Sequence, residues 1–593
     1  MRSLEEHHLA LMGTAPSGFQ LAAWREEHTV VSSALAECVA AHNDATDWGV
    51  TFEFELPFEG GRRPDVVVLA GDAIVVLEFK REAVLPIAYF DQVKAYARDL
   101  ADYHEASHGK LVAPVLVSTA GSTIARLENG VAVESATTLG SRLLDLAEGG
   151  DVDLRGWLSA PYAPLPTLVD AARRIFEHEA LPHVRRALSA RIPETVDLVA
   201  SLIAESKAEG RRRLVLLTGV RGAGKTLVGL RVVYEKAGLD GTEATFLSGN
   251  GPLVKVLQDA LGSSVFVRDL HRFISSFGLT DRVPKQHVLV FDEAQRAWDR
   301  EYMKYKKKGE YSEPELLISI GQRLPGWATL VGLVGGGQEI YSGEEGGLSQ
   351  WRDAIAASRD PGAWEVHCPP SLASTFEGLE VVARHELELT VSLRSRRAEL
   401  LHSWVADLLD GDLDAASEAA SAIQAEKFPL YVTRDLDVAR GYAEDRYQGE
   451  EHARYGLLAS SHAKSLTKYD VDNTWWTTNK VKEARWYNDG PGMPLSCCAL
   501  DQPVTEFGCQ GLELDLPIVC WGEDVRWDAS DWKLTPARRK YPQERPIDLL
   551  RNTYRVLLTR GRDGVVVFVP DATAFDATAD ALLRGGFTAL SAA

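Results

Sequence analysis

The chain has 593 residues, of which 45% are hydrophobic and 25% charged, and its formal net charge is −21. This length exceeds what one hydrophobic core supports, so several domains are expected in a globular protein of ordinary composition. The negative charge excludes a protein that coats nucleic acid by charge alone, although an enzyme can still gather its positive charge in one channel.

No apolar run approaches the ~18 residues that a membrane span requires, and the N-terminus lacks the apolar core of a signal peptide. The six cysteines form no C-x-x-C pair and no zinc-type spacing with histidine, so reduced thiols in the core are expected. These features predict a cytoplasmic protein without a membrane partner.

Acidic and basic side chains flank two neighbouring apolar runs in the first part of the chain. Asp65 precedes the run at residues 66–69, and Glu78 and Lys80 end the run that starts at Ala73. Because side chains alternate along a strand, Glu78 and Lys80 lie on one face. Two carboxylates and a lysine meeting at a hairpin are what divalent-metal cleavage of phosphodiesters requires. Asp65 and Glu78 would hold Mg²⁺, with Mn²⁺ as an alternative, and Lys80 would steady the nucleophile or the developing charge.

This pattern resembles the PD-(D/E)xK nuclease family, with Pro64-Asp65 and Glu78-Phe79-Lys80 as its two halves. Further on, Gln92 and Tyr96 have the Gln-x-x-x-Tyr spacing of the nucleases of RecB-like enzymes, and the resemblance adds both to the predicted catalytic site. It implies a restriction-endonuclease-like α/β domain over residues 1–150.

The same family places an acidic metal ligand on the helix that precedes these strands. We take Glu26 as this ligand, and Glu27 and Glu37 are alternatives that the sequence leaves open. A simpler interpretation also stands beside the nuclease one, because Glu-x-Lys at the end of a strand is common as an ordinary ion pair.

A connector is expected over residues 151–210, where three prolines stiffen a linker and helical patterns follow. Helicases commonly place a glutamine ahead of the phosphate loop to read adenine, and none occurs between Gly156 and Arg213. ATP is therefore assumed as the nucleotide.

An apolar run at residues 214–217 turns directly into Gly219-x-x-x-x-Gly224-Lys225-Thr226, the phosphate loop of a nucleotide triphosphatase. The glycines let successive backbone N–H groups and the next helix's N-terminus point at the phosphates. Lys225 would reach the β- and γ-phosphates, and Thr226 would hold Mg²⁺. The predicted nucleotide-binding residues are Gly219, Gly222, Gly224, Lys225, Thr226 and the Asp292 described next.

Two later apolar runs end in residues that suit phosphate chemistry. The run at residues 288–291 ends in Asp292, expected on Mg²⁺, and Glu293, expected to polarise the attacking water. The run at 329–334 leads to Gln338, placed to sense the γ-phosphate. Since all three strands carry these residues at their carboxyl ends, one parallel sheet is predicted, forming a RecA-like lobe over residues 211–385.

A second set of signals predicts a second RecA-like lobe over residues 386–593. The segments around Arg394, Gln510-Gly511 and Thr559-Arg560 resemble motifs IV, V and VI of superfamily 1 helicases. The resemblance implies that Arg394 and Arg560 approach the γ-phosphate from this lobe, so that ATP closes the cleft and hydrolysis opens it.

The whole series is similar to the DUF2075 (Schlafen group 3-like) helicase domain and covers roughly residues 211–570. Two positions depart from the usual pattern: Arg221 stands where the family often has proline, and Gly335 where many superfamily 1 motors have aspartate.

The predicted fold class is therefore α/β, with a restriction-endonuclease-like domain followed by two RecA-like parallel-sheet lobes. The predicted activity is that of an ATP-dependent helicase with a Mg²⁺-dependent nuclease, acting on DNA rather than RNA. The arrangement is similar to bacterial nuclease–helicase immunity enzymes that act against phage. Repair or recombination, and an ATP-gated nucleic-acid sensor with an inactive nuclease fold, are the alternatives. Self-association is left open.

Nucleic-acid contacts are expected from clusters of basic and aromatic residues. The sequence offers the clusters Arg211–Arg213, Lys304–Lys308, Arg394–Arg397 and Arg538–Lys540, and the aromatic pairs Trp475-Trp476 and Trp486-Tyr487. Aromatic side chains that stack on bases contribute about 1–3 kcal/mol each. The loop Lys304–Lys308 is the favoured contact, although solvated loops and core tryptophans are the simpler interpretation of each cluster.

Overall fold

The computed structural model describes residues 15–59, 61–121, 124–147, 149–150, 153–164, 166–177, 191–220, 223–236, 243–335, 347–390, 396–535 and 546–591. The chain divides into two compact units. Unit 1 comprises Met1–Pro164, Arg440–His452 and Ser591–Ala593, and unit 2 comprises Leu165–Ala439 and Ala453–Leu590. None of the helices in the described part has the length and apolar character needed to cross a bilayer.

Unit 1 is built on a six-stranded mixed sheet in the order β1-β2-β3-β4-β6-β5. Its strands are β1 (Gly49–Phe52), β2 (Val66–Ala70), β3 (Ala73–Lys80), β4 (Val112–Ser118), β5 (Arg126–Glu128) and β6 (Val131–Ser135). Strands β2 and β3 form an antiparallel hairpin, whereas β3, β4 and β6 are parallel.

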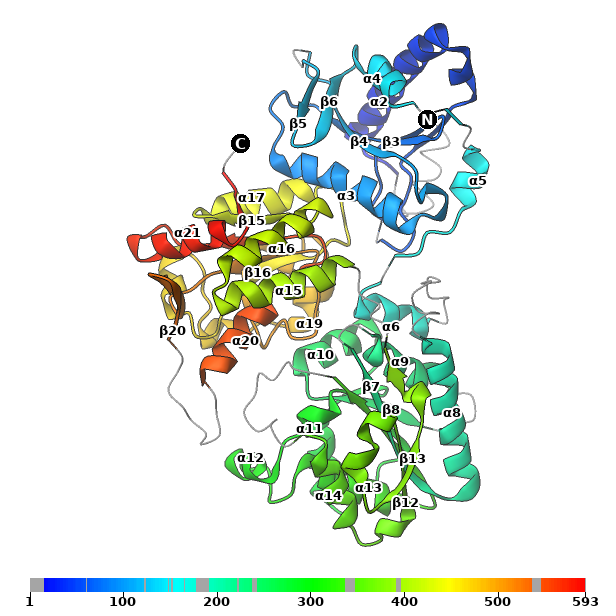
Figure 1. Cartoon of the computed structure of the whole chain (residues 1–593), viewed down its shortest axis with the longest axis vertical. Helices are drawn as coiled ribbons and strands as arrows, with labels where there is room; N and C mark the ends of the chain where they lie inside the picture. Colours follow the sequence, from blue (N-terminus) through cyan, green and yellow to red (C-terminus); the bar gives the residue numbers. More distant parts are fainter. Residues whose placement is uncertain are drawn as a thin grey trace. The chain divides into compact units, whose positions relative to one another are not determined.

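Helices cover both faces of this sheet (Figure 1). Helices α2 (Gly18–Ala41) and α4 (Leu139–Leu146) pack on the face that carries Val66 and Val68. Helix α3 (Ile87–Tyr103) packs on the opposite face with Val67 and Leu69, and α5 (Leu154–Ser159) contributes Trp157 to the same core. Because alternate strand residues point to opposite faces, a continuous run of valines serves both cores.

Unit 2 begins with α6 (Leu168–Phe176) and α8 (Ile192–Glu209) and then forms two sheets. The first has the order β13-β12-β7-β11-β10-β8-β9, and all its pairings are parallel. Its strands are β7 (Arg212–Gly219), β8 (Ala244–Ser248), β9 (Val267–Asp269), β10 (Val288–Phe291), β11 (Ala328–Val334), β12 (Trp364–Cys368) and β13 (Glu380–Ala383), with β14 (Glu388–Leu389) beside β7. The predicted parallel sheet is confirmed, and β11 lies between β7 and β10.

The helices of this first lobe are α9 (Lys225–Arg231), α10 (Gly251–Ala260), α11 (Leu270–Phe273), α12 (Arg300–Tyr305), α13 (Glu313–Arg323) and α14 (Ser349–Ala356). The capping residues that sequence rules favour are present. Ser312 and Glu315, for example, form a reciprocal capping box at the start of α13.

The second lobe also has a parallel sheet, in the order β17-β16-β18-β21-β15-β22. Its strands are β15 (Leu430–Thr433), β16 (Tyr455–Ala459), β17 (Val504–Thr505), β18 (Leu516–Cys520), β21 (Val565–Phe568) and β22 (Thr588–Ala589), and β19 (Val525–Asp528) and β20 (Asp531–Leu534) form a separate hairpin. Its helices are α15 (Arg396–Asp410), α16 (Leu413–Ala425), α17 (Leu436–Arg446), α18 (Trp475–Thr478), α19 (Glu483–Asn488), α20 (Pro546–Leu558) and α21 (Asp576–Arg584).

One connection of the second lobe belongs to both units. Helix α17 follows β15 of unit 2, but its residues from Arg440 onward belong to unit 1. The chain returns to unit 2 at Ala453 and forms β16. We call Arg440–His452 the crossover segment.

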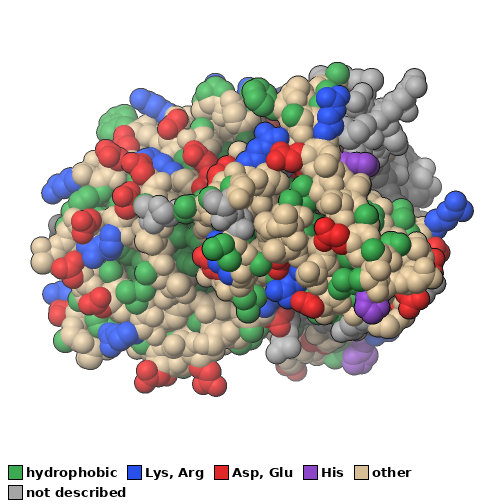
Figure 2. Space-filling view, turned by 90° about the horizontal axis from the view of Figure 1, so that it is seen from above, with side chains coloured by type: hydrophobic (Ala, Val, Ile, Leu, Met, Phe, Trp, Pro, Cys, Tyr) green, Lys and Arg blue, Asp and Glu red, His purple; other side chains and the backbone are tan. Residues whose placement is uncertain are grey.

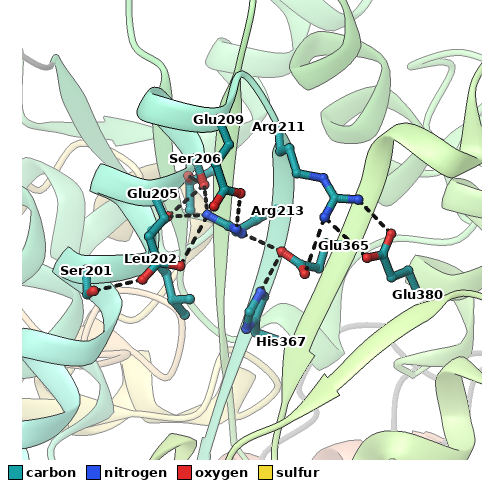
Figure 3. Close-up of polar contacts among 11 residues, drawn as sticks. Ser201, Leu202, Glu205, Ser206, Glu209, Arg211, Arg213, Glu365, His367 and Glu380 are labelled. Atoms are coloured by element: carbon teal, nitrogen blue, oxygen red, sulfur yellow. Dashed lines mark hydrogen bonds and ion pairs between the residues drawn. The ribbon is translucent and has the colours of Figure 1, made fainter.

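The amino-terminal end of β7 is fixed by a network of charges centred on the buried Arg213 (Figure 3). The Arg213 guanidinium donates to Glu365 Oε2 of β12 at 2.5 Å, to Glu209 Oε2 at 2.7 Å and to the Leu202 carbonyl at 3.2 Å. Burial alone would raise the pKa of Glu365, but hydrogen bonds from Arg213 and His367 hold it below its usual value. The network ties the connector helix α8 to the sheet.

The arginine cluster that begins the first lobe therefore has a structural role. Arg212 donates to the carbonyl oxygens of Gly321, Gln322 and Leu324, and Arg211 pairs with Glu380 at 2.7 Å. These side chains are engaged within the lobe, and the contact with nucleic acid that the sequence allowed for them stays a prediction.

We predict that Arg213→Met destabilises unit 2 by about 3–5 kcal/mol, because it leaves the buried Glu365 carboxylate without its main partner. Arg211→Met is the matched control: Arg211 is 36% exposed, so its loss should cost less than about 1 kcal/mol. Denaturant unfolding of both variants measures the difference, and equal effects would show that the buried network does not hold α8 to the sheet.

Candidate functional site

The β2–β3 hairpin brings together the acidic and basic residues that the sequence singled out. Val66 lies opposite Leu77 in the antiparallel register, so Asp65 falls opposite Glu78. Asp65 Oδ2 accepts a hydrogen bond from the Phe79 N–H at 2.7 Å. Both carboxylates and Lys80 therefore lie at one end of the hairpin.

Lys80 connects this hairpin to helix α3. Its Nζ donates to Glu78 Oε1 and to Gln92 Oε1, both at 3.0 Å, and lies 4.3 Å from the centre of the Tyr89 ring. Burial would lower the pKa of Lys80, but the carboxylates of Glu78 and Asp65 raise it above its ordinary value. Lys80 is thus a buried cation, and Gln92 donates in turn to the Tyr96 hydroxyl at 3.3 Å.

Helix α2 supplies a further carboxylate, and it is Glu27 rather than Glu26. Glu27 is 6% exposed, and burial together with Glu53 and Glu78 raises its pKa to about 8. Glu26 instead forms an exposed ion pair with Arg81 at 3.0 Å. Glu37 lies against Gly140 of α4, on another part of the helix.

The spacing of buried residues along α2 distinguishes Glu27 from Glu26. The buried residues of α2 include Trp24, Glu27, Val31, Ala34 and Cys38, spaced three or four apart along one side of the helix. Glu27 continues this buried stripe, whereas the adjacent Glu26 lies beside it. Applied to α2, the spacing rule selects Glu27.

Glu53 is a carboxylate of this cluster that the sequence did not single out. It follows β1 with a positive φ of 50°, accepts a hydrogen bond from Trp24 Nε1 at 2.7 Å and pairs with Arg63 at 2.5 Å. Burial is the main cause that raises its pKa.

The charge and the oxygen donors of the cluster fit a divalent cation. Oε2 of Glu27 and Oε2 of Glu78 are buried and have no hydrogen-bond partner among the described residues. Burial, then Glu78 and Glu27, raise the pKa of Asp65 well above its ordinary value. Mg²⁺ and Mn²⁺ take oxygen ligands of this kind, and their charge would offset the repulsion between the carboxylates.

The carboxylates are not gathered into a finished ligand set. Across the part of the chain that the structure describes, no three His, Cys, Asp or Glu side chains are grouped closely enough to hold a metal ion. One oxygen of Asp65 is held by the backbone and one of Glu78 by Lys80.

A second constellation lies at the carboxyl end of β7. Gly224, at φ 86°, ends the phosphate loop, and Lys225 begins α9. Lys225 Nζ donates to the carbonyl oxygens of Gly219 at 2.8 Å and Val220 at 3.1 Å, so the lysine lies across the loop. The predicted Gly222 lies outside the described residues.

Two predicted Mg²⁺ ligands of this lobe are in contact. Thr226 Oγ1 donates to Asp292 Oδ1 at 3.3 Å. Burial, followed by repulsion from Glu293, raises the pKa of Asp292 to about 7. A hydroxyl and a buried carboxylate placed together beside a phosphate loop fit a nucleotide-bound Mg²⁺.

Gln295 orients the predicted catalytic Glu293 and was missed by sequence reasoning. Its amide nitrogen donates to Glu293 Oε2, and its amide oxygen accepts from the Gly335 N–H at 2.9 Å. A Cβ atom on Gly335 would lie 2.9 Å from Glu293 Oε2. The glycine that departs from the usual aspartate thus leaves room for the Glu293 carboxylate.

The predicted arginine finger Arg560 points into its own lobe. It is 6% exposed, and its guanidinium donates to the carbonyl oxygens of Val556 at 2.9 Å and Leu512 at 3.3 Å. In this arrangement Arg560 braces motif V, and reaching a nucleotide would require these bonds to break. Arg394 and Gln338 lie outside the described residues.

Motif V contacts the first lobe within unit 2. Asn250, at the start of α10, donates from Nδ2 to the Gln510 carbonyl at 2.6 Å. Gly511 has φ 73°, and a Cβ atom there would lie 2.5 Å from Asn250 Nδ2. Both the backbone conformation and the close approach require glycine.

The aromatic pairs separate into surface and core. Trp475 and Trp476 are 64% and 70% exposed, whereas Trp486 and Tyr487 are buried. On the face drawn in Figure 2, basic and acidic side chains are interspersed. The favoured basic loop is partly engaged, since Lys304 lies 3.8 Å from Glu301 and Lys306 lies over the Tyr302 ring.

Comparison with known proteins assigns the second unit to a family. The model of the Schlafen group 3 DNA/RNA helicase domain matches residues 212–571. A solved structure described as the structural basis for DNA unwinding at forked duplex DNA by two coordinating Pif1 helicases matches 63% of this chain and 91% of that chain, at 13% identity and a TM-score of 0.29. A search of curated proteins found no match.

We predict that Glu27→Gln weakens Mn²⁺ binding to unit 1 at least about tenfold, because it replaces a buried carboxyl group, which gains a negative charge when it loses its proton to the metal, by a neutral amide. The matched control Glu26→Gln should bind Mn²⁺ like the parent chain, since Glu26 is paired with Arg81 outside the cluster. Isothermal titration in an Asp292→Asn background measures this site without the metal of the first lobe, whose predicted ligands are Thr226 and Asp292. Equal weakening by both variants would remove Glu27 from the site.

Proposed function

The chain belongs to the Schlafen group 3 DNA/RNA helicase domain family, and from that premise we propose an ATP-dependent nucleic-acid helicase or translocase that carries a metal-dependent nuclease. The family match covers the motor, residues 212–571. The nuclease half rests on a single observation, the cluster of buried carboxylates around Lys80.

In the motor, the residues at the edge of the parallel sheet account for nucleotide hydrolysis. Lys225, which donates to the Gly219 and Val220 carbonyls, would bind the phosphate oxygens of a bound nucleotide, and Thr226 and Asp292 would hold the accompanying Mg²⁺. Glu293, oriented by Gln295, positions the attacking water. Asn250 of the first lobe contacts the Gln510-Gly511 segment of the second lobe. A conformational change at the nucleotide site can therefore be transmitted to the second lobe through this contact.

In unit 1, Asp65, Glu78 and Glu27 would hold Mg²⁺ or Mn²⁺. A metal bound there supplies Lewis-acid polarisation of the phosphoryl oxygen and a more acidic water. Lys80 places a positive charge where the phosphoryl group gains negative charge, and Gln92 fixes its direction.

An ATP-gated nucleic-acid sensor is the second candidate function. Its specific support is that the described residues contain no preformed group of three metal-ligating side chains. In that case the nuclease fold would bind nucleic acid without cutting it, and the ion pair of Lys80 with Glu78 would be structural.

We further propose a cytoplasmic role in defence against phage DNA, by similarity to nuclease–helicase immunity enzymes, with repair or recombination as the alternative. The six cysteines lie within the described residues as buried free thiols, which suits a reducing compartment. Protection of plasmid-bearing cells against phage, set against sensitivity to DNA damage after deletion, separates the two roles.

Separate variants should separate the two activities. Lys225→Ala is expected to lower ATP hydrolysis at least about 100-fold and to retain metal-dependent cutting, because the lysine serves only the phosphate loop. Asp65→Ala is expected to abolish cutting and to spare ATP hydrolysis. Labelled single- and double-stranded DNA and RNA, incubated with and without ATP and Mg²⁺, provide both measurements.

Opposite results identify which part of the proposal is wrong. Full ATP hydrolysis in Lys225→Ala would contradict the phosphate-loop assignment. Metal binding without cutting by the wild type would favour the sensor, whereas joint loss of both activities in Asp65→Ala would indicate misfolding.

A further inference from the structure

The crossover segment, Arg440–His452, completes a hydrogen-bonded chain that ends at Lys80. Tyr96 donates from its hydroxyl to Glu450 Oε1 at 3.0 Å. Gln92 donates to the same hydroxyl oxygen at 3.3 Å, and Lys80 donates to Gln92 Oε1 at 3.0 Å. Glu450 comes from the connection between two strands of the second lobe, although all four residues lie in unit 1.

The three members of this chain beyond Lys80 are buried. Tyr96 is 2% exposed, Gln92 5% and Glu450 6%. Burial, then the negative charges of Glu450 and Glu78, raise the pKa of Tyr96 well above its ordinary value, so its hydroxyl keeps its proton and donates. Buried polar chains of this kind are costly unless each member is satisfied.

The carboxylate of Glu450 fixes the direction of the whole chain. A carboxylate can only accept, so the Tyr96 proton points towards Glu450 and the hydroxyl oxygen is left to accept from the Gln92 amide nitrogen. The amide oxygen of Gln92 then faces Lys80. Without Glu450, the Tyr96 hydroxyl can donate its proton to the amide oxygen of Gln92. The Gln92 amide group would then be rotated by about 180°, so that its NH₂ group, instead of its oxygen, faces the Lys80 ammonium.

A second buried contact holds the crossover segment against the same helix. Tyr442 donates to Asp91 Oδ2 at 2.9 Å, and Arg446 NH1 lies 2.6 Å from the Tyr442 hydroxyl and 3.9 Å from Asp91 Oδ2. Arg446 is 1% exposed. Asp91 precedes Gln92, so the anchor and the chain act on adjacent residues of α3.

The geometry points to Glu450 as a positioning residue for the unit 1 site: through Tyr96 and Gln92, a residue carried by the motor's own chain holds Lys80 in its working direction. This inference rests on the proposed nuclease and names a part of it that lies outside residues 1–164. A nuclease domain cut away from the motor would lack this residue.

The test uses full-length chain and labelled DNA with Mn²⁺. Glu450→Ala and Tyr96→Phe should each lower kcat for cutting about tenfold and leave KM for DNA unchanged, because they misdirect Lys80 without touching substrate. The conservative Glu450→Gln retains an accepting oxygen for Tyr96 and should restore kcat to within about threefold of wild type. ATP hydrolysis should be unchanged in all of them.

A double variant and a neighbouring control distinguish positioning from stability. Tyr96→Phe combined with Glu450→Ala should cut no more slowly than either single variant, because both break one chain. Glu451→Ala, at an exposed neighbouring position, should behave as wild type. A merely structural role would lower kcat additively, together with the unfolding midpoint.

Each other result overturns the inference. Wild-type kcat in Glu450→Ala, additive losses in the double variant, or equal losses in Glu450→Gln and Glu450→Ala would each remove Glu450 from the site, while cutting abolished by Lys80→Ala would still uphold the nuclease. A wild-type chain that binds Mn²⁺ but cuts nothing would overturn the proposed nuclease and this inference together.

Discussion

A cluster of carboxyl groups around a single lysine, where the β2–β3 hairpin meets α2 and α3, is the constraint on which unit 1 depends. Burial and the nearby Glu78 carboxylate raise the pKa of both Asp65 and Glu27, and Lys80 is the cation of the cluster. Burying carboxylates around one ammonium costs free energy that a hydrophobic cluster would not. Such an arrangement is typical of a site that binds a cation and reacts, rather than one that only holds a fold.

In unit 2, the geometry of a parallel sheet brings the predicted site residues together. In a parallel sheet, all carboxyl ends meet at one edge, so residues after β7, β10 and β11 gather there without any special local sequence. Thr226 touches Asp292, and Gln295 joins Glu293 to Gly335. At the opposite end of β7, the Arg213 network holds α8 in place, so catalysis and stability occupy different ends of the same strand.

The sequence predicts features that depend on neighbouring residues, and it does not predict contacts between residues that are far apart in the chain. Alternation along β2 and β3, and the apolar runs before the phosphate loop and Asp292, are local patterns, and they predicted the β2–β3 hairpin and the parallel strands β7 and β10. The burial of Glu27 could also have been predicted, because Glu27 belongs to the stripe of buried residues along α2. The ion pairs of Arg211 and Arg213 could not be predicted from the sequence, because their partners Glu380 and Glu365 are more than 150 residues away.

The crossover segment shows why the remaining part was beyond sequence patterns. The sequence of its helix is that of an ordinary connection between β15 and β16. No pattern in the neighbouring residues indicates that Glu450 contacts Tyr96, 354 residues away. Once placed, the segment is constrained twice, because its ends join β15 and β16 of one sheet while Tyr442 and Glu450 form hydrogen bonds with Asp91 and Tyr96 of α3. The segment is therefore joined covalently to two strands of the second lobe, while its own hydrogen bonds place it in the unit that contains Lys80. No pattern confined to a few neighbouring residues encodes such a double constraint, because its two halves come from parts of the chain that are hundreds of residues apart.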